Sequence, residues 1–174
     1  IMIQQMLSGY RIRVANSERV QVEKWDSNHV SKGQPSGKLR YEEKKNDLVP
    51  LLEAQRNYEQ NSQAAKDLGE MLFEVLFDDT LRNDFVLFYN QVVQIQKQIL
   101  RIELDIDEQS FPEIAALPWE FMRVPQSAGI GTIWLGTVPD VSLSRRRAQW
   151  IAAQPIQLGA GEKLRIALVV SAPN

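Results

Sequence analysis

Hydrophobic and polar residues alternate in two short runs near the start of the chain. The first covers residues 10–14 and the second residues 20–25, with a polar link at residues 17–18 between them. Two alternating runs joined by a short polar link predict a β-hairpin with one buried and one solvent-exposed face. Residues 26–45 are polar and contain glycine and proline, so we expect a long exposed loop with a short strand at residues 39–41.

The hydrophobic period then becomes helical. Apolar residues spaced by three and four predict helices over about residues 46–58, 62–76 and 79–95. Each helix starts at residues that can cap it, which are Asn46 and Asp47, Ser62, and Asp78 and Asp79. The third helix should bury a seam made of Leu81, Phe85, Phe88, Val92 and Ile95. Each helix has a single apolar stripe and therefore needs a surface to cover it.

The period changes to two at residues 100–106, which predicts a strand with one buried face. A short helical turn is expected at residues 113–117, because prolines stand on both sides of it. Residues 133–135 and 141–143 have the pattern of short strands, and Pro139 and Asp140 are suited to the turn that joins them.

The last hydrophobic run, residues 164–170, is almost continuously apolar. This pattern is typical of a strand that is covered on both faces, as in a parallel sheet. Such a strand needs a crossover and neighbouring strands. Only four residues follow it, so we expect an incomplete sheet whose missing strands come from elsewhere, and a chain that is a fragment.

The composition is that of one globular domain. The chain has 174 residues, 44% hydrophobic and 24% charged, with a formal net charge of −2. A weakly negative chain has no general attraction to polyanions, so we expect no nucleic-acid partner. The longest uninterrupted apolar runs are about five residues, against roughly twenty for a membrane-spanning helix, so we expect no membrane association.

The chain contains no cysteine and one histidine, His29. It therefore supplies no thiolate nucleophile and no thiolate ligand for zinc, and this composition agrees with a reducing cytoplasm. His29 lies in the polar loop, where we interpret it as solvated. A catalytic histidine needs a nucleophile within hydrogen-bond reach, and the sequence indicates none. We expect no cofactor and no metal.

Acidic residues alternate with apolar ones in the strand at residues 100–106. Glu103, Asp105 and Asp107 could bind a divalent cation and serve a metal-dependent hydrolase. We favour the other interpretation, in which they form the solvent-exposed side of an amphipathic strand.

Arg145, Arg146 and Arg147 form the one basic cluster. It could clamp a phosphate or an acidic partner, or be a site of proteolytic cleavage. We favour a solvated helix start or charges that guard a sheet edge. Gly129 and Gly131 resemble part of a phosphate-binding loop, but the lysine and hydroxyl residue of that motif are missing.

One block of residues has a specific family resemblance. The amphipathic strand at residues 100–106 is followed by Leu117-Pro118-Trp119-Glu120 and two large apolar residues. Segments of the type Thr-Ile-Trp-Leu-Gly (132–136) and Ser-Leu-x-Arg (142–145) come next, and then the apolar run from residue 164. In this order they resemble the entry region of CHAT domains, prokaryotic relatives of caspases.

The resemblance implies an α/β fold, the N-terminal portion of a caspase-like (caspase–haemoglobinase) three-layer sandwich. Residues 1–97 would be a leading hairpin, polar loop and three-helix region, and residues 98–174 the start of the CHAT domain up to its first core strand. The proline of the motif fixes a turn, the indole fills core volume, and Glu120 can accept hydrogen bonds from backbone or indole donors. We interpret the motif as scaffold.

The family's histidine–cysteine dyad has no counterpart in this chain. The resemblance thus implies a non-catalytic segment of a cytoplasmic bacterial cysteine endopeptidase of a regulatory or defence system. Its partners would be the remainder of the peptidase domain or a partner chain, and the parent's protein substrate. The alternative is a protein–protein interaction module that uses the helical region and the polar loop.

Overall fold

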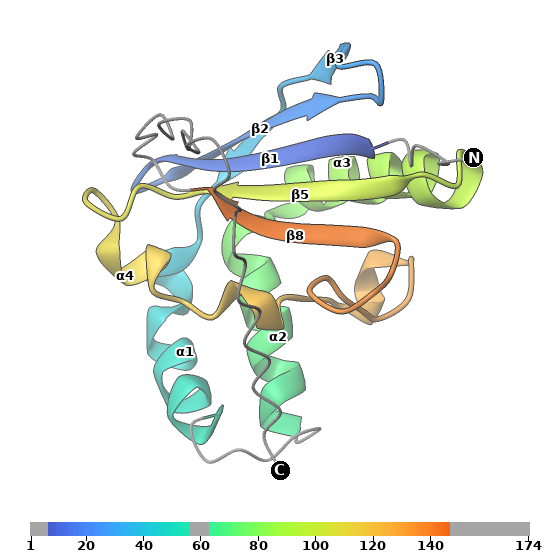
Figure 1. Cartoon of the computed structure of the whole chain (residues 1–174). Coiled ribbons are helices and arrows are strands. Elements are labelled where there is room, and N and C mark those ends of the chain that lie inside the picture. Colours follow the sequence, from blue (N-terminus) through green and yellow to red (C-terminus); the bar gives the residue numbers. More distant parts are fainter. Residues whose placement is uncertain (1–6, 56–62, 147–174) are drawn as a thin grey trace, which may run out of the picture.

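The computed structural model describes residues 7–55 and 63–146, and its centre is a mixed β-sheet (Figure 1). The strand order is β3-β2-β1-β5-β8, and β4 also pairs with β2. β1 and β2 are antiparallel, whereas β1, β5 and β8 are parallel. The strands are β1 (Leu7–Asn16), β2 (Arg19–Trp25), β3 (Ser31–Gly33), β4 (Ser36–Lys38), β5 (Ile99–Asp105) and β8 (Val141–Arg146).

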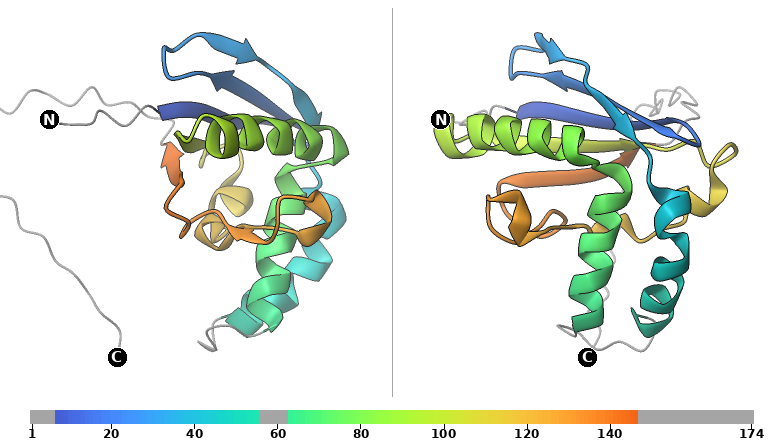
Figure 2. Two further views of the ribbon diagram at one scale, coloured as in Figure 1. Left: turned by 90° about the vertical axis from the view of Figure 1, so that its right-hand side faces the viewer. Right: turned by 180° about the vertical axis from the view of Figure 1, so that it is seen from behind.

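The helices lie on one side of this sheet (Figure 2). Three of them connect the hairpin to β5, and a shorter one lies in the connection from β5 to β8, beside a two-stranded sheet. These elements are α1 (Tyr41–Gln55), α2 (Gln63–Leu76), α3 (Asp79–Tyr89), a π-helix (Asn90–Ile95), α4 (Pro112–Ala115), two 3₁₀ helices (Trp119–Phe121 and Gln126–Ala128), β6 (Arg123–Val124) and β7 (Ile133–Trp134). The fold is α/β.

No helix within residues 7–55 and 63–146 has the length and apolar character that crossing a membrane requires.

One face of the sheet and the facing sides of the helices form the core. Tyr10 of β1 and Ile102 of β5 are neighbours in the parallel register, and both are fully buried. The ring of Tyr10 packs edge-on against Phe85 of α3, with centroids 5.4 Å apart, and Phe73 of α2 stacks on Phe77 at 4.2 Å. Aromatic contacts therefore fix α2 and α3 against β1.

The opposite face of the sheet carries charged residues in cross-strand pairs. Arg11 of β1 lies between Glu23 of β2 and Glu103 of β5, with a nitrogen–oxygen distance of 2.8 Å to each carboxylate. Arg13 pairs with Asp105 at the same distance. Opposite charges on neighbouring strands of one face stabilise a sheet and fix its register. Glu103 is only 7% exposed, so its charge depends on these pairs.

Trp25 lies across β1 at Gly9, its partner in the antiparallel register. A Cβ atom at Gly9 would stand 1.9 Å from Cε2 of the indole, so only glycine leaves room for the ring. The guanidinium of Arg11 lies over the same ring, 5.1 Å from its centroid.

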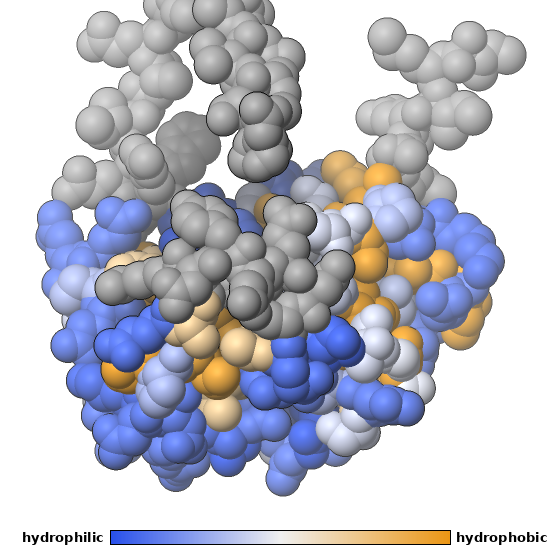
Figure 3. All heavy atoms as spheres, turned by 90° about the horizontal axis from the view of Figure 1, so that it is seen from below, coloured by the Kyte–Doolittle hydropathy of each residue, from blue (hydrophilic) through white to orange (hydrophobic). Residues whose placement is uncertain are grey.

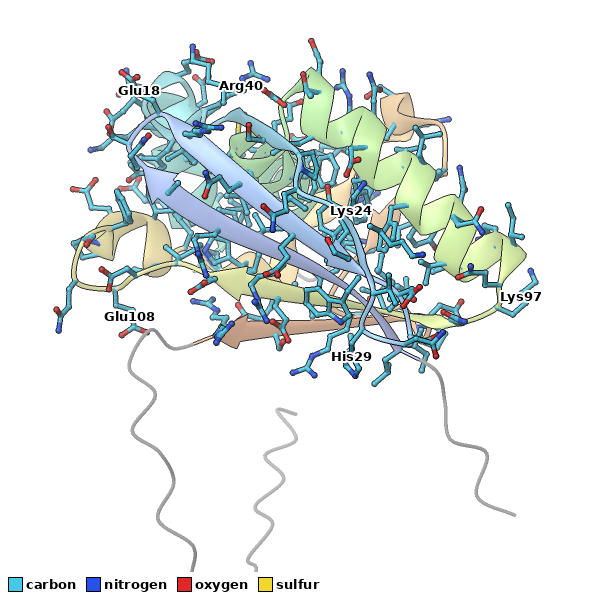
Figure 4. All side chains as sticks on the ribbon, turned by 90° about the horizontal axis from the view of Figure 1, so that it is seen from above. Glu18, Lys24, His29, Arg40, Lys97 and Glu108 are labelled. Carbon is cyan, nitrogen blue, oxygen red and sulfur yellow. The ribbon has the colours of Figure 1, made fainter. Side chains whose placement is uncertain are left out.

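An ion pair fastens α3 to the hairpin. Lys24 of β2 reaches toward α3 (Figure 4) and pairs with Asp84, whose second oxygen accepts the hydroxyl of Tyr10 at 3.0 Å. Both side chains of the pair are largely buried. The carboxylate is satisfied from two strands at once, which fixes the position of α3 over the sheet.

Several sequence predictions are confirmed. The hairpin forms, α2 covers almost the predicted range, and β5 begins and ends one residue earlier than predicted. Asp78 caps α3, because its side chain accepts the backbone N–H of Leu81 at 2.9 Å.

The prediction of a long exposed loop over residues 26–45 with a short strand at residues 39–41 is wrong. This segment contains β3, β4 and the start of α1 at Tyr41, and no strand forms at residues 39–41. β3 and β4 have three residues each and both pair with β2. The Asp78 carboxylate also accepts the N–H of Lys38 at 2.7 Å, so β4 is held by a residue distant in sequence. Short polar strands leave no hydrophobic period to detect.

Ile95 does not belong to the buried seam of the third helix, since it is 69% exposed, whereas Val93 is buried. The reason is the π-helix that follows α3, because its wider turn rotates the later residues relative to an α-helix. Residues 133–134 and 141–146 form strands, but they belong to different sheets and do not pair with each other. The predicted strand at residues 164–170 lies outside the described residues.

Replacing Gly9 with alanine should destabilise the fold by about 1–3 kcal/mol, because the new methyl group displaces the Trp25 ring from Arg11. In a Trp25→Ala background the same replacement should cost almost nothing, since the clash is gone. Urea unfolding of the four proteins of this double-mutant cycle checks the coupling. Equal effects of Gly9→Ala in both backgrounds would contradict the role of the ring.

Burial, reinforced by the Asp84 carboxylate, raises the pKa of Tyr10 well above its usual range. Because the folded-state pKa is raised, the stability that the protonated Tyr10 hydroxyl contributes is fully present below the unfolded-state pKa of about 10. It is lost as the pH rises through the folded-state pKa. We expect the free energy of unfolding to fall less steeply above about pH 10 in Tyr10→Phe than in the parent. Urea titrations at several alkaline pH values test this, and parallel curves would refute it.

Candidate functional site

The Leu-Pro-Trp-Glu motif, residues 117–120, follows the carboxyl end of β5. Leu117 and Trp119 are buried, and the indole Nε1 of Trp119 donates a hydrogen bond of 2.9 Å to the carbonyl oxygen of Ile114 in α4. Pro118 stands between them, directly before the 3₁₀ helix of residues Trp119–Phe121. The indole thus joins the end of α4 to the core and holds the turn that presents Glu120.

Glu120 and Arg145 form a bidentate ion pair. Nε and Nη2 of Arg145 donate to the two carboxylate oxygens of Glu120, each at 2.7 Å. Hydrogen bonding to this guanidinium lowers the pKa of Glu120, so the carboxylate stays ionised at neutral pH. The carboxylate therefore pairs with an arginine of β8 instead of the indole.

Arg145 also binds the backbone of the α4 segment. Nη1 donates to the carbonyl oxygen of Ala115 at 2.8 Å and Nη2 to that of Leu117 at 2.9 Å. The carbonyl group of Ala115 ends a short helix and has no partner within it, so this bond satisfies it, whereas that of Leu117 also accepts the backbone N–H of Trp119 at 2.9 Å. Arg145 consequently ties β8 to the whole turn between α4 and the 3₁₀ helix.

The three arginines of the basic cluster do not act as one group. Arg145 and Arg146 are consecutive residues of β8, so their side chains point to opposite faces of the sheet. Within residues 7–55 and 63–146, Arg146 has no ion-pair partner, although Asp105 stands opposite it in the strand register. The cluster begins in a strand and not at a helix start. Arg147 lies outside the described residues.

A hollow of about 300 Å³ opens beside these residues at the carboxyl ends of β5 and β8. Its lining residues are Leu104, Ile106, Glu108, Ala115, Trp119, Arg145 and Arg146. Ligands of open α/β sheets bind beyond the carboxyl ends of parallel strands, which makes this the candidate site by position. Sequence reasoning missed Leu104 and Ile106 as lining residues because their alternation indicated only a buried face.

The chemistry of the hollow is that of a binding surface. Its apolar part comes from Leu104, Ile106 and Trp119, its cationic part from the two arginines, and its one acid is Glu108. None of the lining side chains is a thiol, an imidazole or a hydroxyl that could attack a substrate. The arrangement suits an apolar group or a polypeptide segment with an acidic end.

His29 does not approach this site. It lies in the turn after β2, away from Glu108, which follows the carboxyl end of β5 (Figure 4). Its backbone has a positive φ of 61° and its N–H donates to the carbonyl oxygen of Asp26 at 2.9 Å. These features belong to a tight turn, so the geometry gives His29 a role in the local backbone only.

The acidic residues of β5 are not a shared ligand set. Glu103 pairs with Arg11 and Arg101, and Asp105 pairs with Arg13. Asp107 lies beyond the end of β5 and accepts hydrogen bonds from Gln109 and Ser110 in the following turn, which lowers its pKa. Across the described ranges, no group of three or more potential ligands is placed to hold a metal ion.

Gly129 and Gly131 have positive φ angles of 81° and 82° and lie in the loop between β6 and β7. A Cβ atom at either position would meet nothing within 4 Å, so neither glycine marks a close approach of the backbone to another group.

Comparison with protein-family models and with curated proteins gives no match to this chain.

Replacing Arg145 with lysine should destabilise the protein by about 1–2 kcal/mol, because an ammonium group cannot make the paired contacts to Glu120 and to two carbonyl oxygens together. The matched control is Arg82→Lys on α3, whose guanidinium makes a single contact within the described part of the chain, to Asp79, and where less than about 0.5 kcal/mol is expected. Urea unfolding of both variants measures the difference, and equal losses would contradict the role given to Arg145.

Proposed function

We propose that this chain is the leading, non-catalytic segment of a caspase-like cysteine endopeptidase of the CHAT type. The observation that supports this most is the ion pair of Glu120 and Arg145. These residues end the two motifs on which the resemblance rests, Leu-Pro-Trp-Glu and Ser-Leu-x-Arg, and they are 25 positions apart in sequence. Two motifs that meet through a bidentate contact form one structural unit.

The role of this unit is to scaffold the rest of the peptidase sheet. β8 pairs with β5, and within residues 7–55 and 63–146 no strand pairs with its other edge. A parallel strand with an open edge can accept a further strand. The remaining strands of a three-layer caspase-like sandwich, from the remainder of the peptidase domain or a partner chain, would add beside β8. Arg145 fixes β8 for that contact.

The catalytic dyad belongs to the rest of the parent protein in this proposal. The described segment would position the peptidase sheet. Signals that activate a cytoplasmic regulatory or defence peptidase would reach this sheet through β8 and the α4 turn. The substrate of the parent would be a protein.

A separate observation favours the alternative, a protein–protein interaction module. Leu87 of α3 and Ile95 of the following π-helix are 72% and 69% exposed and lie on the side of the helix away from the sheet. Seen from below, the molecule also shows hydrophobic areas among hydrophilic ones (Figure 3). Contiguous exposed apolar patches rimmed by polar residues mark protein–protein interaction sites.

The parent protein should carry a reactive thiol outside this chain. Residues 1–174 contain no cysteine, so a thiol-directed peptide probe can label only other parts of the native polypeptide or its complex. We expect the native polypeptide, or a partner bound to it, to be labelled at one cysteine near a histidine-bearing strand. Intact mass and peptide mapping of the native material give the answer.

The scaffold role is tested in the same material with Arg145→Lys. Protein cleavage should fall by about tenfold or more, since small displacements of a catalytic framework are costly. Arg101→Lys, which keeps the charge of a half-exposed arginine on the opposite face of the same sheet, should leave cleavage unchanged. A native 19.9 kDa polypeptide without a thiol-bearing partner would exclude the peptidase proposal and leave the interaction module.

A further inference from the structure

A second hollow lies on the charged face of the sheet, between β1, β2 and β4. It has a volume of about 280 Å³ and is lined mainly by polar groups. Its lining residues are Arg11, Arg13, Arg19, Gln21, Val22, Glu23, Gln34 and Ser36. Figure 4 looks onto this face, with β1 and β2 in front of the helices. This hollow is separate from the carboxyl-end site and shares no residue with it.

Arg13 and Arg19 bring hydrogen-bond donors to this hollow. Arg13 stands opposite Gln21 in the β1–β2 register, and Arg19 precedes Gln21 by two residues on the same face. Side chains in such a diagonal relation lie roughly 7–8 Å apart at their backbone ends, which long arginine side chains easily bridge. An anion between them would therefore contact both guanidinium groups.

Most of these donors have no partner within the described residues. Arg13 uses Nε for Asp105, and Arg19 uses Nη2 for the hydroxyl of Ser36 at 3.0 Å. No carboxylate pairs with Arg19 in the described part of the chain. A guanidinium group has five N–H donors, so each arginine keeps several for a ligand.

Cationic residues predominate among those that line the hollow, although Arg11 and Arg13 are also paired with carboxylates of β5 and the chain as a whole is weakly negative. Three arginines line it, against one carboxylate. That carboxylate, Glu23, is already bound by Arg11 at 2.8 Å, and Arg11 is further held over Trp25. Glu23 is thus kept on the Arg11 side. Asp105 binds only Nε of Arg13 and does not line the hollow, so the other donors of Arg13 and those of Arg19 face no acid among the lining residues.

We propose that this hollow is a binding site for a small phosphate-type oxyanion, held between Arg13 and Arg19 and contacted by Gln21 and Ser36. Donors from three strands converge there, which suits the several acceptor oxygens of a tetrahedral anion better than the two of a carboxylate. The volume exceeds that of a single phosphate group, so a phosphate monoester of a small alcohol also fits. This inference does not depend on the proposed peptidase role.

The test is an NMR titration of the full chain at constant ionic strength, which follows the arginine side-chain Nε–H signals. Inorganic phosphate and glycerol phosphate are the two ligands, with chloride as the reference anion and acetate as the planar control. We expect saturable shifts of the Arg13 and Arg19 signals with a phosphate ligand and weaker effects of acetate. Saturation by only one of the two ligands identifies the source as the free anion or the monoester.

Arg19→Gln should weaken this binding by about tenfold, since it removes a charge-assisted donor. The matched control, Arg101→Gln, removes the same charge from the same face of the sheet outside the hollow and should bind like the parent. The proposal is overturned if neither ligand gives a saturable shift, or if Arg101→Gln loses as much affinity as Arg19→Gln. The second result would mean that binding follows the net charge of this face and not the donors of the hollow.

Discussion

The arrangement depends on one arginine at the open, carboxyl end of the row of side chains that face the helices. Along the parallel strands β1, β5 and β8, the side chains that face the helices are almost all apolar, and the exception at the carboxyl end is Arg145. The side chains of Arg145 and Glu120 are 40% and 62% exposed, so this guanidinium is held in place by the geometry of its pairing and not by burial. Glu120 and two backbone carbonyl groups provide this pairing, so the connection between β5 and β8 is wrapped around the arginine. The position of Trp119 and the hollow beside it follow from that contact.

The two faces of the sheet have different chemistry because apolar and charged side chains alternate along the strands. The helix-facing side is stabilised by burial and aromatic packing, whereas the other side is held by rows of opposite charges centred on Arg11 and Glu103. The apolar and cationic hollow at the carboxyl end lies where the helix-facing side opens. The arginine-lined hollow lies on the charged side, where the strands β1, β2 and β4 meet. Each surface therefore suits a different partner.

Patterns of period two and period three to four were sufficient to predict the hairpin, α2, the Asp78 cap and β5, because burial of one face imposes those periods. They were insufficient for β3 and β4, which are polar and held by pairing with β2 and by Asp78. The π-helix after α3 altered the phase at Ile95 without a local signal. At the candidate site, the sequence indicated a strand only at residues 141–143, so neither the place of Arg145 in β8 nor its partner 25 residues earlier could be found without the fold.

The most direct measurement is a double-mutant cycle of Glu120→Gln and Arg145→Met, with unfolding free energies from urea titration. If the pair organises the connection between β5 and β8, the coupling free energy should be about 1 kcal/mol or more. A coupling below about 0.3 kcal/mol, the level of an ordinary surface ion pair, would contradict the account.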